Sequence, residues 1–392
     1  MINKRCFRPQ NRANKLRLKP AERTASSTLK AVLAAALAIP GVTTSTLAQT
    51  APDEAAMRLQ YSYYKDRQAG GEDRVRIRSP LAWARMPFGE TWEAEGSFQY
   101  DSFSGASPQY LSTLSGASGK GINDIRRAGD LKFTRYFERF ALGLGGLVSS
   151  EDDYNSRGGI FEGRWWTDDK NTTLTTGFAA YADDISATNN PRVDERRRTV
   201  HFLLGGTQVL DRSSLIQSNL SYGAANGFLT DPYKFFDNRP RNRHSLAWLT
   251  RYNRFIEKTR GSLHLDYRYY RDNWSIISHL FDVAYYQPLG SIWTFRPSVR
   301  YYTQSSADFF SNIYPPTDFD IHYSADQRLG GFGGVTLGLK VYCNIGWGTT
   351  LDLSAEYLRQ KPDYKLGGDH NSEGIERFVA EIFSFGITKK FS

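Results

Sequence analysis

The sequence predicts an all-β protein, a transmembrane antiparallel up-and-down β-barrel of about sixteen strands, and three observations support this prediction. Apolar and polar residues alternate over long segments of the 392-residue chain, for example over residues 92–100 and 293–301. The links between these segments are alternately short and long. Aromatic pairs such as Trp165-Trp166 lie near the segment ends, where a membrane barrel carries its interfacial girdles.

The basic character of the chain is concentrated at its N-terminus. The formal net charge is +9, and residues 1–30 hold nine cations and one acid. An apolar run follows at residues 33–39, and Thr46-Leu47-Ala48 has small residues at its first and third places. A basic start, a short apolar run and a small-x-small site are the three parts of a secretory signal peptide.

We therefore expect residues 1–48 to be a cleavable signal peptide and residues 49–392 to form a single barrel domain. Cleavage would leave a net charge of +1, which removes the global argument for a nucleic-acid partner. It would also remove Cys6 and leave Cys343 alone, so a disulfide scaffold and a cysteine-built metal site are excluded. The sequence predicts no metal site and no cofactor.

The alternative to a membrane barrel is a soluble sandwich, whose strands also alternate. The segments here run for about ten residues or more, which matches a tilted transmembrane strand and exceeds the usual soluble strand. Their polar faces carry full charges in mid-strand, which a dry sandwich core could not accommodate. The mean hydropathy of −0.52 excludes helical spans and leaves the barrel as the prediction.

The element order follows from the alternation. We expect strands near residues 57–66, 74–85, 91–101, 128–137, 140–150, 156–167, 171–182, 197–209, 214–223, 243–254, 261–271, 274–287, 292–304, 327–343, 349–360 and 377–391. Short links follow the even-numbered strands, and most links after the odd-numbered strands are long: 102–127, 183–196, 224–242, 305–326 and 361–376. This alternation indicates tight periplasmic turns and extended extracellular loops, with both termini periplasmic.

The last predicted strand carries an assembly signal. Val379, Phe383, Phe385, Ile387 and Phe391 share one face, and the chain stops one residue later. A terminal strand with an aromatic residue at its end is typical of outer-membrane barrels. It predicts that the barrel-assembly machinery is a partner during insertion.

Five motifs together resemble a known family. They are Ser104-Gly105-Ala106-Ser107-Pro108, Asp231-Pro232-Tyr233-Lys234 with Asp237 and Arg239-Pro240, Tyr267-Arg268-Tyr269-Tyr270-Arg271-Asp272, Arg300-Tyr301-Tyr302-Thr303-Gln304-Ser305, and Tyr323-Ser324-Ala325-Asp326-Gln327-Arg328-Leu329. The chain resembles the bacterial outer-membrane family of domain of unknown function 3570. The resemblance implies a barrel in the outer membrane of a Gram-negative bacterium, and it transfers no activity and no functional residues.

The inward face of the barrel supplies the first set of candidate residues. By alternation we expect these charged side chains to face the lumen: Arg58, Arg76, Arg78, Glu93, Glu95, Asp101, His264, Asp266, Arg268, Arg296, Arg300, Lys340, Asp352 and Glu356. Opposed charges across a water-filled lumen set the field that selects a solute. The alternative is that neighbouring charges simply pair across strands and hold the wall together, and both can apply at once.

Basic clusters in the predicted external loops supply the second set. They are Arg192, Arg196, Arg197 and Arg198 in one loop, and Arg239, Arg241 and Arg243 in another. Arginine forks suit phosphate, so contact with lipopolysaccharide in the outer-membrane lipid is one interpretation. Neutralisation by Asp194, Glu195 and Asp237 nearby is the other.

The leading functional prediction is a porin-like channel for small hydrophilic solutes, and the protein is not expected to be an enzyme. A barrel of this size has room for an aqueous channel, and the 102–127 loop could either constrict it or remain external. A non-conducting scaffold that binds a partner in an envelope redox or secretion assembly is the alternative. A barrel hydrolase using His264 beside Asp266 is the third hypothesis, and no catalytic nucleophile is identifiable.

Overall fold

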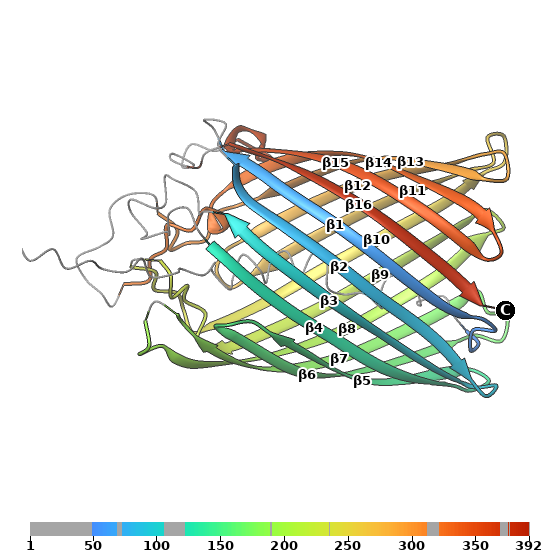
Figure 1. The fold of residues 1–392 in the computed structure, drawn as a ribbon, viewed down its shortest axis with the longest axis horizontal. Coiled ribbons are helices and arrows are strands. Elements are labelled where there is room, and N and C mark those ends of the chain that lie inside the picture. Colours follow the sequence, from blue (N-terminus) through green and yellow to red (C-terminus); the bar gives the residue numbers. More distant parts are fainter. Residues whose placement is uncertain are drawn as a thin grey trace, which may run out of the picture.

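The computed structural model describes residues 49–68, 73–105, 122–188, 190–234, 236–311, 321–368, 375 and 377–391. Within these ranges the chain forms sixteen antiparallel strands that close into one barrel, because β1 pairs with β16 (Figure 1). The predicted fold class and strand number are therefore confirmed. No helix in the described ranges is long and apolar enough to cross a membrane. The predicted leader and residues 106–121 lie outside the described residues.

The strands are 11 to 18 residues long, which is at least the length that a tilted transmembrane strand needs to cross the membrane. They are β1 Ala55–Gln68, β2 Asp73–Phe88, β3 Trp92–Gly105, β4 Ile122–Tyr136, β5 Phe140–Ser150, β6 Tyr154–Trp166, β7 Thr172–Ser186, β8 Asp194–Asp211, β9 Ser214–Gly227, β10 Asn242–Ile256, β11 Gly261–Asp272, β12 Ile277–Leu289, β13 Trp293–Gln304, β14 Phe332–Gly346, β15 Thr349–Lys361 and β16 Phe378–Phe391. Two short 3₁₀ turns, η1 Gln327–Leu329 and η2 Pro362–Tyr364, complete the described elements.

The start of β14 differs from the sequence prediction, which began that strand at residue 327. Residues Gln327–Leu329 instead form η1, because the Asp326 carboxylate accepts the backbone N–H of Arg328 and caps the turn. The strand itself begins at Phe332. A local side-chain hydrogen bond therefore overrides the extended pattern at this position.

The two faces of the wall differ in chemistry. Large apolar side chains are exposed on the outward face of every strand, including Leu144, Leu204 and Leu353. The inward face carries polar and charged side chains, many of them buried against one another. This is the arrangement of a membrane barrel, in which lipid covers the apolar face and water or protein groups satisfy the polar one.

The two ends of the barrel also differ. At one end, which we call the turn end, short links follow the even-numbered strands. β1 begins and β16 ends at this same end (Figure 1). Gly89 and Gly290 adopt positive φ in two of these turns, where a side chain would be strained. The long links lie at the opposite end, the loop end, although the links 69–72, 151–153 and 273–276 on that side are short.

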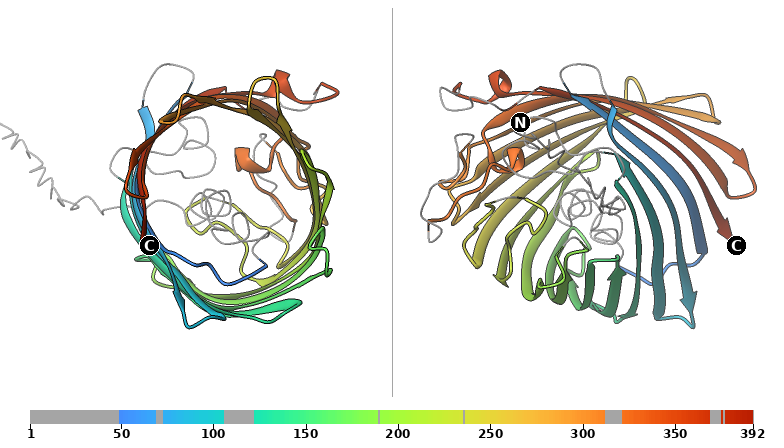
Figure 2. Two further views of the ribbon diagram at one scale, coloured as in Figure 1. Left: turned by 90° about the vertical axis from the view of Figure 1, so that its right-hand side faces the viewer. Right: turned by 60° about the vertical axis from the view of Figure 1, so that its left-hand side comes forward.

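Three links at the loop end pack into one unit, which we call the loop body: residues 228–241, 273–276, 305–311 and 321–331. Its apolar core consists of Leu229, Trp274, Ile276, Ala307 and Leu329. Viewed along the barrel axis, the 228–241 segment and η1 lie inside the outline of the ring (Figure 2). The loop body therefore lies across part of the barrel opening.

The segment before β1, residues 49–54, runs across the turn end. Gln49 donates from its side-chain amide to the carbonyl of Lys170 and to Thr173 Oγ1, both at 3.0 Å. Ala51 packs against a buried cluster formed by Tyr136, Ala141 and Trp166. From the start of β1, this segment therefore crosses the turn end and attaches to the β4–β7 side of the wall (Figure 2).

Candidate functional site

The inward wall of β3, β4 and β6 is a dense network of buried charges. The predicted lumen residue Asp101 accepts from Arg126 Nε at 2.7 Å. Glu95 lies 3.4 Å from Lys132 Nζ, which also reaches Glu162 at 3.6 Å. Such pairing holds the wall together more than it creates a field in the lumen, because the charges of Asp101 and Glu95 are each compensated within one side-chain length.

Glu93 belongs to the same wall and is 1% exposed. Its carboxylate accepts from Tyr136 OH at 2.9 Å, and the guanidinium of Arg164 lies 5.3 Å from the Tyr136 ring centroid. Trp83 Nε1 donates to the neighbouring Glu95 at 2.9 Å. The aromatic residues therefore supply hydrogen bonds that the carboxylates would otherwise seek from water.

A second network joins β1, β15 and β14 across the closure of the barrel. Arg58 donates to both carboxylate oxygens of Asp352, at 2.7 and 2.9 Å, and Lys340 Nζ lies 2.8 Å from the same carboxylate. The Arg58 side chain reaches Asp352 over Gly386 of β16, the strand between them. A Cβ at Gly386 would lie 2.5 Å from Arg58 Nη2 and 2.6 Å from Asp352 Oδ2, so a larger residue would displace this ion pair.

A third row of charges crosses β10 to β13. Arg251 Nε donates to Asp266 at 3.0 Å, and Arg300 Nε donates to Asp282 at 2.8 Å. Asp266 and Asp282 lie directly opposite each other in the strand register. The two like charges are tolerated because a guanidinium on each outer strand neutralises one of them.

Arg268, Arg296 and Glu356 make no ion pair with any described residue, and neither does Glu93, whose carboxylate is bound by Tyr136 instead. Arg268 is exposed on the inward face. The Arg296 guanidinium lies 5.4 Å from the Tyr286 ring centroid, and that ring stacks with Tyr342 at 6.3 Å. These uncompensated cations and aromatic rings are on the β11–β14 side of the lumen, opposite the compensated wall.

His264 also faces the lumen. Its Nε2 shares a hydrogen bond with Ser262 Oγ at 3.1 Å, and its ring lies 4.6 Å from that of Tyr286. The Asp266 carboxylate two residues on is bound by Arg251. The sequence left the nucleophile unidentified, and Ser262 now occupies a position within reach of the imidazole.

Arg76 and Arg78 were expected in the lumen, and this expectation is wrong. Both are exposed on the outward face of β2, where Arg78 pairs in register with Tyr63. Val75 and Ile77 point inward instead and pack against Tyr64. The reason is strand parity. Successive residues of a strand face opposite sides of the sheet, so Arg76 and Arg78 point away from the lumen when Val75 and Ile77 point into it.

Sequence reasoning missed the inward cations and acids that complete these networks. Among them are Arg126, Lys132, Glu162, Arg164, Arg251 and Asp282. Period-two alternation, carried along each strand from an outward aromatic residue, would have placed them on the polar face.

The loop body is held by a buried cluster of ion pairs built from two of the five sequence motifs. Arg239 Nη2 donates to Asp237 at 3.2 Å and to Asp326 at 3.0 Å. Arg328 Nε donates to both oxygens of Asp326, at 2.7 and 2.8 Å, and its Nη2 reaches Asp231 at 3.3 Å. Residues almost ninety positions apart in the chain therefore form one buried unit.

The electrostatics of the cluster keep Asp326 ionised. Burial acts to raise its pKa, but the nearby positive charges of Arg328 and Lys234 outweigh burial and hold the pKa well below its usual value. The pKa of Asp231 is lowered by the same balance. Asp237 differs, because burial outweighs its contact with Arg239 and raises its pKa.

The structure divides the predicted lipopolysaccharide contacts into two groups. Arg239 is 5% exposed and bound within the loop body, so its expected contact with lipopolysaccharide is wrong. Arg197 donates to Asp183 and Tyr154, and Arg243 donates to Asp272 and stacks on Trp274 at 4.4 Å. These three guanidinium groups are engaged by the protein. Exposed arginines remain at positions 192, 196, 198 and 241.

Of these exposed arginines, Arg196 lies 3.4 Å from Asp184, and Arg241 donates to Glu195 at 2.9 Å. The expected alternative, neutralisation by nearby acids, therefore applies to part of the set. Arg198 makes no ion pair with a described residue.

A closed ring of long antiparallel strands with an apolar outer face and a polar interior defines an outer-membrane β-barrel protein. The chain belongs to the family described as "Protein of unknown function (DUF3570)", whose model matches residues 29–375. No curated protein matches the chain in sequence.

Solved structures with a similar fold are outer-membrane barrels. A bacterial polysaccharide outer membrane secretin has 10% identity and a TM-score of 0.50, and the match covers 86% of this chain and 98% of that chain. A BenF-like porin from Pseudomonas fluorescens Pf-5 has 11% identity and a TM-score of 0.44, with coverages of 86% and 98%. OccK2 of Pseudomonas aeruginosa in complex with glucuronate has 11% identity and a TM-score of 0.44, with coverages of 88% and 99%. At these identities the likeness concerns the fold alone.

Proposed function

We propose that the protein is a channel for small hydrophilic solutes in the outer membrane of a Gram-negative bacterium, exported through a cleaved signal peptide. The observation that carries this proposal is the chemistry of the inward face, where charged side chains such as Arg268 project from the wall without an ionic partner among the described residues. A dry interior would not hold such charges, whereas a sixteen-stranded barrel is wide enough to hold water.

The uncompensated cations support a preference for anionic solutes. Among the described residues, Arg268 and Arg296 outnumber the unpaired Glu356 on the β11–β15 side, whereas Glu95 and Asp101 are paired with cations in the opposite wall. A passing anion would meet positive charge and aromatic faces on one side. The loop body at one end and residues 49–54 at the other narrow the path.

Planar-bilayer recording of the purified mature protein tests the proposal. We expect discrete conductance steps and, under a salt gradient, a reversal potential that indicates anion preference. Replacing Arg268 and Arg296 by Gln should shift that potential toward cation preference. Arg212→Gln, in an exposed turn outside the lumen, serves as the matched control. Absence of steps above the detergent baseline would refute a channel.

A non-conducting scaffold that binds an envelope partner is the second candidate, and the ordered loop body favours it. The body joins three links through an apolar core and buried ion pairs, so it presents a fixed surface at the loop end. Crosslinking from exposed loop positions such as Asp308 should then trap one defined protein. Lipid adducts alone would contradict this candidate.

A barrel hydrolase is the third candidate, based on the contact between Ser262 and His264. Its weakness is that Arg251, and not His264, occupies the carboxylate of Asp266, so the imidazole lacks the orienting acid of a catalytic triad. Turnover of lipid or peptide substrates that is lost in both Ser262→Ala and His264→Ala would support this candidate.

A further inference from the structure

An outward-facing group of arginines lies near the loop end of the wall between β4 and β8. Arg127 of β4, Arg157 of β6 and Arg198 of β8 are all exposed, and none forms an ion pair within the part of the chain that the structure describes. In the register Arg157 pairs with Ala182, and Ala182 pairs with Arg198. Two strand spacings therefore separate these two positions, about 10 Å.

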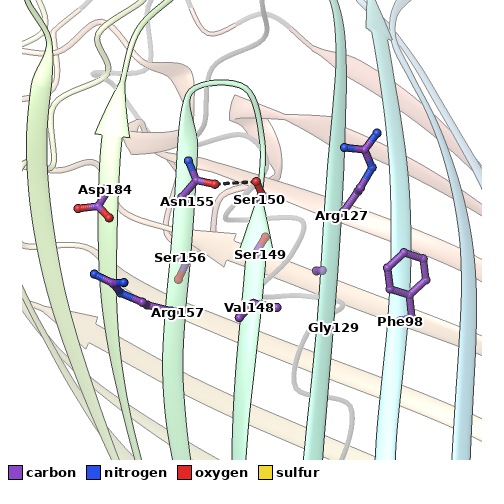
Figure 3. A pocket seen from close by; sticks show the side chains of 11 residues that line it. Phe98, Arg127, Gly129, Val148, Ser149, Ser150, Asn155, Ser156, Arg157 and Asp184 are labelled. Atoms are coloured by element: carbon purple, nitrogen blue, oxygen red, sulfur yellow. Dashed lines mark hydrogen bonds between the residues drawn. The ribbon is translucent and has the colours of Figure 1, made fainter.

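Two of these arginines, Arg127 and Arg157, border a groove on the outer surface. The groove has a volume of about 390 Å³, and Arg127 and Arg157 line it together with Phe98 and Val148 (Figure 3). Gly129 has no side chain and leaves the floor open between them. The groove therefore combines two cations with an apolar portion.

The position of the groove matches the boundary between apolar and polar outer surface. Phe98 and Val148 are 53% and 63% exposed and belong to the apolar outward band. Arg127 pairs with Ser150, the last residue of β5, so the cations lie at the loop-end margin of that band. In a membrane barrel this margin is where lipid headgroups meet the protein.

The local charge is positive. Asp184 is the one acid that lines the groove, and Arg196 lies 3.4 Å from its carboxylate on the neighbouring strand. Arg127, Arg157 and Arg198 are left to attract an anion. Arginine recognises phosphate particularly well, because its planar fork donates two parallel hydrogen bonds.

We propose that this groove binds the phosphorylated headgroup of lipopolysaccharide, with phosphate on Arg127 and Arg157 and an acyl chain against Phe98 and Val148. The proposal shares with the proposed function only the location in the outer membrane, and it does not depend on conduction. Of the arginines predicted to contact lipid, Arg196, Arg197 and Arg198 lie in β8 and Arg243 lies in β10, not in loops. Arg197, Arg239 and Arg243 are engaged in ion pairs, and Arg198 alone of the predicted set belongs to the outward-facing group.

Binding of bisphosphorylated lipid A to the full mature protein in detergent tests the proposal. The double variant Arg127→Gln/Arg157→Gln should bind about tenfold more weakly or worse, because it loses the charge-assisted contacts to phosphate. The matched control is Arg212→Gln/Arg260→Gln, which removes two exposed arginines at the turn end and should bind like the wild type. Wild-type affinity in the Arg127/Arg157 double variant would overturn the proposal.

Further probes distinguish the sources of the phosphate. Dephosphorylated lipid A and phosphatidylglycerol should bind more weakly than bisphosphorylated lipid A, and equal binding of either would overturn the headgroup assignment. Inorganic phosphate should not displace lipid A at equal concentration, since it lacks the acyl contact with Phe98 and Val148. If heat-modifiable gel migration shows that the double variant does not fold, the single variants replace it, and each should weaken binding.

Discussion

Replacing Asp326 by Asn should release the loop body from its closed arrangement. The carboxylate is 2% exposed and receives hydrogen bonds from Arg239 and Arg328, so it neutralises one buried and one partly buried guanidinium group. An amide of the same size keeps the shape and removes the charge. The Arg239 guanidinium would then remain buried with one anionic partner fewer, and leaving a buried charge without its partner is what makes a broken ion pair costly.

The expected magnitude follows from that cost. Removing one partner of a buried ion pair destabilises the surrounding structure by about 3–5 kcal/mol. At about 1.4 kcal/mol for each factor of ten, the lower figure raises the opening equilibrium of the loop body roughly 150-fold. The barrel wall should not respond, because its own networks do not include Asp326.

Hydrogen–deuterium exchange measures this opening directly. The reporter amides are Asn238 and Tyr323, which bond each other's carbonyls at 2.8 Å, and Ala307, which donates to Leu329 at 2.7 Å. Peptides with these amides should exchange faster in Asp326→Asn, while strand peptides keep their protection.

The control is Asp308→Asn, an exposed position in the same link. Equal exchange in the Asp326 and Asp308 variants would refute the electrostatic account of the loop body. If the loop body limits conduction, Asp326→Asn should also increase the single-channel conductance.

Acidification should mimic Asp326→Asn. Because the folded-state pKa of Asp326 is lowered, its stabilisation of the loop body is complete above about pH 3.8 and is lost as the pH falls through the lower folded-state pKa. Exchange of the loop-body amides would detect this loss in the wild type and not in the variant. Gly386→Ala should displace the ion pair between β1 and β15 and lower the temperature of heat-modifiable unfolding, by about 1–3 kcal/mol in stability. Gly206→Ala is its control, because a Cβ there meets only an ordinary contact at 3.7 Å, and equal effects would contradict the steric account. Deleting residues 49–54 should raise conductance by clearing the turn end, and an unchanged conductance would show that the segment does not limit flow.

Local pattern accounts for what could be predicted of the fold. Alternation of period two locates each strand, and alternating link lengths indicate an antiparallel closed ring, because both signals depend only on near neighbours in sequence. The prediction went wrong where a local interaction competes, as at η1, and where parity was misread, as at Arg76 and Arg78.

The candidate site could be predicted only in part. Lys340 and Asp352 were both expected on the lumen face, and they form an ion pair there. The bidentate contact of Arg58 with Asp352 joins residues 294 positions apart and exists only because β16 closes the ring between them. No pattern within one strand contains that information.

The sequence by itself determined the alternating strands, the order in which they pair and the polar character of the lumen, because these follow from the chemistry of adjacent residues. Only the tertiary structure decided which charges neutralise one another and which remain available. Arg239 and Arg268 are both arginines within family motifs, yet the first is buried between two aspartates and the second projects uncompensated into the lumen. The physical reason is that the energy of a charge depends on its partners in space, and barrel closure and loop packing determine those partners.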